Sequence, residues 1–368
     1  VLYCFQQNKC IMSAPESAAA APVAPVPKID PKEARKAARL AEEQAKAREK
    51  AEAMLKYAAI FGAAPMIQST GHKTAVYTSV AKIGAEMANT TVTVRARLHT
   101  SRKKGKLAFI VLRDEGATIQ AMASSSEEIP KEMIDFIGQI PCESIVDVFG
   151  TVVAADQPIT STTQSSVEIK ISKIHVVSES LRVLPFTLDD AQRREDAEGI
   201  KINFDTRLNC RWMDLRSAAS NALFKLQSRV GQYFRQFLIE QDFFEIHTPK
   251  MISTASEGGA NVFKLGYFGR DAYLAQSPQL YKQMAVQGDL KRVFEVGPVF
   301  RAENSNTHRH LTEFVGLDVE MTINEHYYEV LDVAEALFGF IFTNLASQKA
   351  LLDAVNSQYP FEPLVFQV

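Results

Sequence analysis

Apolar and polar residues alternate most clearly between residues 91 and 178. Val92 and Val94 are interleaved with Thr93 and Arg95, which is the period of a half-buried β-strand. The runs that follow read as two strands, a helix and two further strands, at 107–112, 117–122, Glu127–Ile140, 144–153 and 167–177. The pattern therefore predicts three strands, one helix and two strands, in that order.

That order is typical of the OB fold, a small five-stranded barrel that binds oligonucleotides. Thr93–Arg113 contains seven Lys and Arg residues and no acidic residue, so one side of the barrel should be positively charged. OB barrels also bind proteins and sugars, and the fold alone does not choose among these ligands. We predict an OB barrel over residues 75–180.

The second half of the chain mixes helical and strand periodicity. From Asn221 onward the apolar residues follow a helical stripe, which must end before Pro249 because Phe243–His247 favours a strand. Two strands are predicted at Arg292–Glu303 and Leu311–Thr322, followed by an amphipathic helical region. Residues 207–368 should therefore form an α+β domain, an antiparallel sheet with flanking helices.

Three further segments differ in composition. Residues 1–27 should be a disordered or artefactual N-terminus, because Ser13–Pro27 is rich in Ala and Pro and Val1–Ile11 has the character of an upstream extension. Residues 28–60 should form a basic helix, with nine Lys and Arg against six Asp and Glu from Lys28 to Lys56. It is either a solvated spacer or a contact for an RNA backbone. The acid-rich residues 181–206 should be a hinge.

Composition narrows the protein class. The 368 residues carry a net charge of −2, with 46% hydrophobic and 23% charged residues, as expected for a soluble globular protein of about two domains. The four cysteines form no CxxC or Cys/His cluster, which argues against structural zinc and disulfides. The longest apolar run is far shorter than the roughly 20 residues that span a bilayer, so no membrane partner is expected.

Strand parity predicts a chemical site in the second domain. Phe314, Asp318 and Glu320 share one strand face, and Arg301 and Glu303 share a face of the preceding strand. An arginine, an aromatic ring and carboxylates suit a nucleotide, by binding phosphate, base and amino groups respectively. The alternative is a surface ladder of ion pairs with one stray aromatic residue.

A helix start precedes these strands. Ser277 should be its N-cap and Pro278 its first residue, which places Gln279 and Lys282 on one face. A lysine there suits an anionic substrate group, although such a pair is often only a solvated face. Ser256–Gly259 is a glycine-rich loop that could close over a ligand, or an ordinary turn.

Together these segments resemble the class II aminoacyl-tRNA synthetases. Phe300–Glu303, the loop with His308, Arg309 and His310, and Thr312–Phe314 resemble motif 2, and Phe244–Pro249 resembles motif 1. Gln276–Gln283 and Ser256–Gly259 are similar to the aspartyl-tRNA synthetases of the eukaryotic cytosolic type. The resemblance covers nearly all of Lys28–Pro363 and implies an OB-fold anticodon-binding domain followed by a class II catalytic domain.

The resemblance implies an aspartate–tRNA ligase in the cytoplasm that uses ATP and Mg²⁺. L-aspartate would attack the α-phosphate of ATP, and tRNA(Asp) would then accept the aspartyl group. Arg301 would bind the α-phosphate and the substrate carboxylate as the catalytic residue. The resemblance implies the following ATP-binding residues: Arg301, Glu303, Arg309, His310, Leu311 and Phe314. It implies aspartate binding by Glu257, Gln279, Lys282, Arg301 and Asp318.

The resemblance also implies partners for the rest of the chain. Phe109, Gln120 and Glu168 would read the anticodon, and parity independently places Gln120 and Glu168 on outward faces of their strands. Phe109 lies on a strand that is apolar on both faces, so a core role is an equal alternative. A homodimer is expected, with Pro249 at its interface. The metal ligands are unknown, although Glu320 could assist magnesium.

The chain departs from the family after Glu320. No third motif, with its glycine-rich strand and ATP-binding arginine, follows, so we expect a C-terminally incomplete copy that is inactive alone. One alternative is an asparaginyl-tRNA synthetase, against which Lys282 argues, because its ammonium would lack a counter-charge beside a neutral amide. The other is a non-catalytic tRNA-binding protein.

Overall fold

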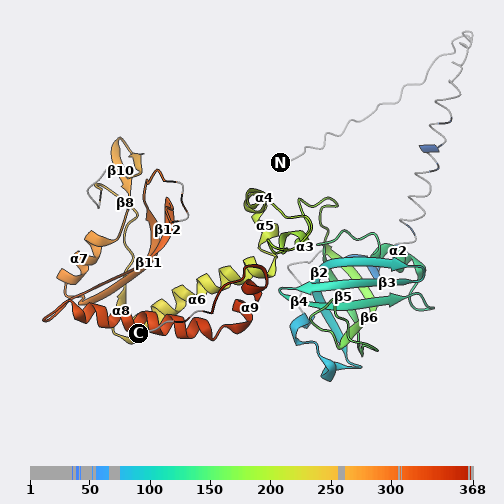
Figure 1. The fold of residues 1–368 in the computed structure, drawn as a ribbon. Helices are drawn as coiled ribbons and strands as arrows, with labels where there is room; N and C mark the ends of the chain where they lie inside the picture. The colour runs from blue at the N-terminus through green and yellow to red at the C-terminus, as the bar shows by residue number, and fades with distance from the viewer. Residues whose placement is uncertain are drawn as a thin grey trace, which may run out of the picture.

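The computed structural model describes residues 35, 39–40, 42, 52, 55–65, 75–255, 262–305, 307, 309–363 and 365. Residues 1–27, most of the predicted basic helix at 28–60, Glu257 and His308 lie outside the described residues. The barrel and the α+β part form two lobes that are joined through short helices (Figure 1). The bounds of the domains set from sequence stay predictions.

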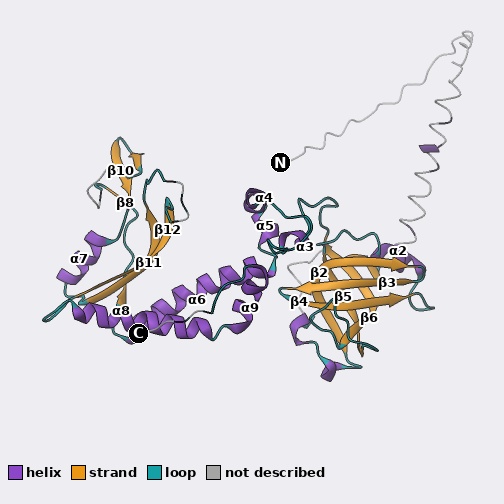
Figure 2. Cartoon of the chain, in the orientation of Figure 1, coloured by secondary structure: helices purple, strands orange, loops and turns teal. Residues whose placement is uncertain are grey.

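The first lobe is the predicted five-stranded barrel (Figure 2). Its elements are β2 (Thr91–Lys104), β3 (Leu107–Asp114), β4 (Ala117–Ser124), α2 (Lys131–Ile137), β5 (Ile145–Ala154) and β6 (Val167–Ser178). The strands follow the order β6-β4-β3-β2-β5, and pairing of β5 with β6 closes the barrel. A short strand, β1 (Phe61–Ala63), adds in parallel to β6. The OB-fold prediction is confirmed.

Alternation along the strands builds the barrel core as the sequence predicted. Val94, Leu98, Ile110, Leu112 and Ile119 are all at most 1% exposed. The helix α2 is shorter than the predicted Glu127–Ile140. Pro130 precedes it, and a proline disfavours helical geometry in the residue before it, so helical pairing begins only after this point.

The second lobe contains a long helix, two small sheets and a C-terminal helical pair. Its helices are α6 (Ala218–Glu240), α7 (Gln279–Gln287), α8 (Tyr328–Ala346) and α9 (Lys349–Gln358). Its strands are β7 (Phe244–Glu245), β8 (Met251–Ile252), β9 (Lys264–Tyr267), β10 (Arg270–Leu274), β11 (Arg292–Phe300) and β12 (Glu313–Met321). The predicted antiparallel pair is β11–β12, but β7 pairs in parallel with β11, so this sheet is mixed.

One face of the β11–β12 pair packs on the helices. Phe234 and Phe237 of α6, Phe294 of β11 and Ile341 of α8 are buried in one cluster, and the rings of Phe234 and Phe294 meet edge to face at 5.9 Å. This packing turns the polar face of the two strands away from the helices. That polar face carries the predicted chemistry.

The segment between the lobes is more structured than the predicted hinge at 181–206. It forms α3 (Leu188–Ala191) and the start of α4 (Phe204–Asn209), and α5 (Arg211–Asp214) follows. Phe186, Leu188, Ala191 and Met213 are buried together. Helices of four to six residues are too short to show helical periodicity. The acid-rich composition therefore predicted a hinge where the chain forms a small core.

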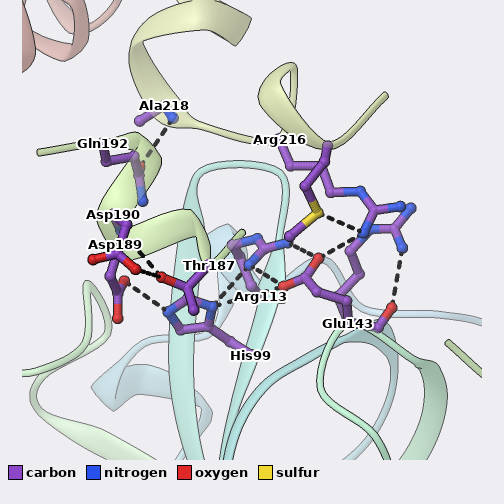
Figure 3. A network of polar contacts seen from close by, with 11 residues as sticks. His99, Arg113, Glu143, Thr187, Asp189, Asp190, Gln192, Arg216 and Ala218 are labelled. Carbon is purple, nitrogen blue, oxygen red and sulfur yellow. Dashed lines mark hydrogen bonds and ion pairs between the residues drawn. The ribbon is translucent and has the colours of Figure 1, made fainter. Parts of the chain in front are cut away.

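A buried ion-pair network joins the barrel to this segment (Figure 3). Arg113 donates to both carboxylate oxygens of Glu143 at 2.8 and 2.7 Å, and Arg216 donates to the same carboxylate at 2.8 Å. Arg113 also donates to Nδ1 of His99 at 2.8 Å, so that nitrogen is the acceptor and Nε2 faces Asp189 at 3.7 Å. The barrel is thereby fixed to the start of α6.

Within the part of the chain that the structure describes, no single helix is long and apolar enough to cross a membrane. The helices α8 and α9, bent by 76° at their junction, pass that test only as a pair and by length and composition.

Candidate active site and nucleic-acid face

Strand register gathers the predicted catalytic residues on one face. Val299 pairs with Phe314, Gly297 with Gly316 and Glu295 with Asp318. Because alternate residues of paired strands share a face, Arg301 continues the row that contains Glu295, and Glu320 continues the row that contains Asp318. The polar face is therefore opposite the face that packs on α6 and α8.

Lys282 lies at the centre of this face. It is only 4% exposed, and its ammonium is hydrogen-bonded to Asp318 and lies 3.3 Å from Oε2 of Glu320. Gln279, one helical turn earlier, donates to Glu320 at 3.2 Å. The predicted pairing of Gln279 and Lys282 on one face of α7 is what brings both side chains to the sheet.

This arrangement changes one argument from the sequence. The ammonium of Lys282 was expected to take its counter-charge from a substrate carboxylate, which argued against a neutral amide substrate. Asp318 and Glu320 already supply that counter-charge within the protein. The charge of Lys282 alone therefore does not separate aspartate from asparagine.

The start of α7 is set by Ser277. Its Oγ accepts a hydrogen bond from the backbone N–H of Gln279 at 3.2 Å, and the helix begins at Gln279, one residue later than predicted. The N-cap is Pro278, so the prediction of Ser277 as N-cap is wrong by one residue, and the Ser277 hydroxyl instead bonds to the first turn from the position before the cap.

Arg301 and Phe314 lie together at the end of the strands. The guanidinium of Arg301 is 5.7 Å from the centroid of the Phe314 ring, within the range of a cation–π contact. Both side chains are half-buried, and backbone N–H of Arg301 donates to Thr312. An arginine beside an aromatic ring is the pair that parity predicted for phosphate and base.

The loop between the strands carries the remaining ATP candidates. His310 lies 3.6 Å from the carboxylate of Glu303 and 2.6 Å from the hydroxyl of Thr307. Arg309 and Leu311 are exposed at the open side of the loop. The structure therefore places Glu303 and His310 in contact and leaves Arg309 and Leu311 facing solvent.

A second cluster on the same face was missed by the sequence analysis. Glu295 is 3% exposed and accepts hydrogen bonds from the backbone N–H and hydroxyl of Thr248, at 2.9 and 2.7 Å. Lys250 lies 2.9 Å from the same carboxylate. Glu295 has the parity of Arg301, so strand periodicity contained the information needed to find it.

The partners of Glu295 keep it ionised. Burial alone would raise the pKa of Glu295, but the hydrogen bonds from Thr248 and the charge of Lys250 outweigh burial and hold that pKa below its ordinary value. Lys250, Glu295, Gly297, Gly316 and Asp318 all line one small cavity on this face, together with Pro278 and Val299. Asp318 is therefore the residue at which the cluster around Glu295 meets the predicted aspartate-binding residues.

The barrel presents a separate polar face. Phe109, Gln120 and Glu168 are all half-buried on the outside of their strands, and the amide of Gln120 donates to Glu168 at 2.7 Å. Phe109 pairs with Met122 one row along the sheet, while its neighbours Ala108 and Ile110 point into the core. The core alternative for Phe109 is therefore wrong.

Two predicted site residues, Pro249 and Glu257, are not placed on either of these faces by the described structure. Pro249 is exposed in the segment that follows β7, flanked by exposed Phe244 and Met251, which are 60% and 57% accessible. Glu257 lies outside the described residues, so its place relative to the pocket stays a prediction.

The described residues do not by themselves fit a magnesium ion. Among the residues described, no three His, Cys, Asp or Glu side chains gather to hold a metal. Glu320, the residue expected to assist magnesium, is occupied by Lys282 and Gln279.

Comparison with family models matches both lobes. Residues 92–177 match the OB-fold nucleic acid binding domain, and residues 203–367 match the class II tRNA synthetases of the D, K and N group. The two matches follow the order of the barrel and the α+β lobe.

Individual relatives are similar over most of the chain. The chain is 50% identical to aspartate–tRNA ligase 2, cytoplasmic, of Arabidopsis thaliana, over 79% of this chain and 54% of the relative. It is 43% identical to the cytoplasmic aspartate–tRNA ligase of Caenorhabditis elegans, over 92% of this chain and 68% of the relative. The chain thus spans little more than half the length of some curated relatives.

Solved structures separate two related groups. A crystal structure from Leishmania major Friedlin, assigned as an aspartyl-tRNA synthetase, matches with a TM-score of 0.82 and 63% identity, over 86% of this chain and 62% of that chain. An asparaginyl-tRNA synthetase from Pyrococcus horikoshii matches with a TM-score of 0.65 and 26% identity, over 78% of this chain and 64% of that chain. The asparaginyl enzyme is the more distant of the two.

Proposed function

Because the chain belongs to the class II aminoacyl-tRNA synthetases, and within them to the aspartate–tRNA ligase family, we propose that the full-length protein ligates L-aspartate to tRNA(Asp) in the cytoplasm. ATP is the substrate that activates the amino acid. The observation that carries this proposal is the cluster of Lys282, Asp318 and Glu320 on the same strand face as Arg301.

The charges of that face complement aspartate. Free aspartate carries two carboxylates and one ammonium, and the face offers two cations, Lys282 and Arg301, beside the carboxylates of Asp318 and Glu320. Arg301 would bind the α-carboxylate, Lys282 the side-chain carboxylate, and Asp318 the ammonium, with Gln279 beside it. Asparagine would make one charged contact fewer, but because Asp318 and Glu320 already balance Lys282, the charge of Lys282 alone does not exclude it.

Activation is a displacement at phosphorus. An oxygen of the aspartate α-carboxylate forms a bond to the α-phosphorus of ATP, the bond to the bridging oxygen breaks, and pyrophosphate leaves with that electron pair. Arg301 would stabilise charge on the α-phosphate, and Phe314 would stack on adenine. The terminal ribose hydroxyl of tRNA then takes the aspartyl group and AMP leaves. Positioning, rather than a protein nucleophile, supplies the catalysis.

Pyrophosphate exchange tests this function. With full-length protein, ATP and each amino acid in turn, L-aspartate should be the amino acid that drives exchange of pyrophosphate into ATP. Equal exchange with asparagine would replace the proposal by the asparaginyl alternative. Binding of tRNA without exchange by any amino acid would favour the non-catalytic alternative.

The barrel should recognise the anticodon through a stacked base. Phe109→Ala is expected to weaken tRNA(Asp) binding by about 1–3 kcal/mol, because a half-exposed ring on a basic barrel would stack one splayed base. Filter binding of tRNA(Asp) measures the loss. Phe136→Ala, on the helix α2, is the matched control, and a loss as large in the control would contradict an anticodon role for Phe109.

The basic segment that precedes the barrel should contribute to RNA affinity. Deleting residues 28–57 is expected to weaken tRNA binding and to make it less dependent on salt, because fewer phosphates would be neutralised. Affinity measured across a series of salt concentrations gives the slope. An unchanged slope would support the spacer alternative.

We also propose a homodimer through the segment that carries Pro249. Phe234, Phe237 and Phe243 are buried in the core and offer no surface to a partner. Exposed Phe244 and Met251 on either side of Pro249 support the interface instead. Sedimentation of the full-length protein at micromolar concentration should give a dimer, and Met251→Glu should weaken it. A monomer in the unsubstituted protein would contradict this proposal.

A further inference from the structure

Two paired glycines form the floor of the cavity beside the predicted aspartate pocket. Gly297 and Gly316 face each other across β11 and β12. A Cβ atom built on Gly297 would lie 3.3 Å from Nζ of Lys250, and one built on Gly316 would lie 4.0 Å from Oδ2 of Asp318. Cβ positions of such a pair are about 4.5–5.5 Å apart. The ammonium of Lys250 and the carboxylate of Asp318 therefore lie near paired glycines, with a methyl group of Val299 beside Gly316.

Lys250 is held on its own side of that floor by Glu295. The Lys250 ammonium lies 2.9 Å from Oε1 of Glu295 and donates to the hydroxyl of Thr248 at 3.0 Å. Glu295 is in turn fixed by two hydrogen bonds from Thr248. Because the Glu295 carboxylate is buried and accepts two hydrogen bonds from Thr248, its position is fixed, and it holds the Lys250 ammonium at that position.

Asp318 is held from the opposite side by Lys282. Lys250, from the segment between β7 and β8, lines the cavity together with Asp318, and Lys282 of α7 reaches the same Asp318 carboxylate. The lysine side chain is long and flexible, and a buried ammonium without a carboxylate partner is costly. If Glu295 loses its charge, Asp318 is the other carboxylate among the residues that line this cavity with Lys250.

We propose that Glu295 is a positioning residue for the amino-acid substrate, because it retains Lys250 and so leaves Asp318 to Lys282 and the substrate ammonium. This inference rests on the proposed function of the site. Gly297 is required by the same arrangement, because a Cβ atom there would lie 3.2 Å from the Glu295 carboxylate and would disturb the ion pair of Glu295 with Lys250. Glu295 acts through Lys250 and does not touch the reacting atoms.

The test compares three forms of the full-length protein by pyrophosphate exchange. Glu295→Gln keeps the shape and the acceptor for the Thr248 N–H but removes the charge, and it should raise KM for aspartate about tenfold, with KM for ATP changed less than about twofold. Glu295→Gln/Lys250→Met removes the released ammonium as well and should return KM for aspartate to within about threefold of the original value. A merely structural role would change KM for aspartate and KM for ATP together, so the selective rise in KM for aspartate and its reversal identify a positioning role.

Each outcome decides one question. A double variant as impaired as Glu295→Gln, or equal increases in KM for aspartate and ATP, would overturn the inference. If Glu295→Gln does not fold, Thr248→Val loosens Lys250 while the carboxylate remains, and it should raise KM for aspartate alone by about threefold. An unchanged KM in Thr248→Val would then overturn it. Absence of aspartate-dependent exchange in the unsubstituted protein would instead overturn the proposed function.

Discussion

Replacing Lys282 with methionine in the full-length protein is expected to lower kcat/KM for aspartate by about 10²–10³, with KM for ATP changed less than about threefold. Lys282 is 4% exposed and is bound to Asp318 and Glu320. Methionine keeps the length of the side chain but leaves two carboxylates facing each other without a cation. Both the binding of the substrate carboxylate and the orientation of Asp318 should suffer, whereas the ATP residues on the neighbouring loop keep their contacts.

The matched control for this experiment is Lys291→Met. Lys291 is an exposed lysine immediately before β11, so the same substitution there removes the same charge without touching the site. Pyrophosphate exchange at varied aspartate and varied ATP separates the two effects. Equal losses for aspartate and ATP in Lys282→Met would remove the amino-acid role proposed for Lys282.

Sequence periodicity predicted the faces of the sheet well because the chemistry lies on regular strands. Parity alone placed Arg301, Phe314, Asp318 and Glu320 together, and the register of β11 and β12 agrees. Parity also contained Glu295, but its partners Thr248 and Lys250 lie in an irregular segment some 45 residues earlier. Periodicity says nothing about such a segment, so a buried carboxylate was passed over as an ordinary strand residue.

The partners of charged residues were harder to predict than their positions. Lys282 was placed correctly on α7, yet its two counter-charges come from β12, and only the packing of the helix on the strand reveals them. The junction between the lobes gives the same lesson, because Glu143 is distant in sequence from both Arg113 and Arg216. Ion pairs between distant residues leave no local pattern in a single sequence.

The ion pairs of Glu143 with Arg113 and Arg216 should contribute most of the stability of the contact between the two lobes. Glu143 is 4% exposed and accepts three hydrogen bonds from two arginines. Removing one partner of such a buried group leaves uncompensated charge, and Glu143→Gln is expected to cost about 3–5 kcal/mol of unfolding free energy. Trp212, the single tryptophan of the chain, is a direct probe, since the Arg216 guanidinium lies 4.9 Å from its ring centroid.

The matched control is a second ion pair at the same junction. Lys225 donates to Glu115 at 2.9 Å, but the Glu115 side chain is 74% exposed, so Glu115→Gln should change stability little. Urea unfolding followed by Trp212 fluorescence compares the two variants. Similar losses in both would show that burial is not what makes the Glu143 pair strong.

The same carboxylate should make the junction sensitive to acid. Burial would raise the pKa of Glu143, but hydrogen bonds and charge from Arg113 and Arg216 hold that pKa well below its ordinary value of 4.5. A carboxylate whose pKa is lower in the folded state stabilises the fold fully above its unfolded pKa, and this contribution is lost as pH falls toward the folded pKa. Unfolding free energy should therefore decline below about pH 4.5, and Glu143→Gln should decline less steeply over the same range. Parallel pH profiles for the two proteins would show that other carboxylates govern the acid response.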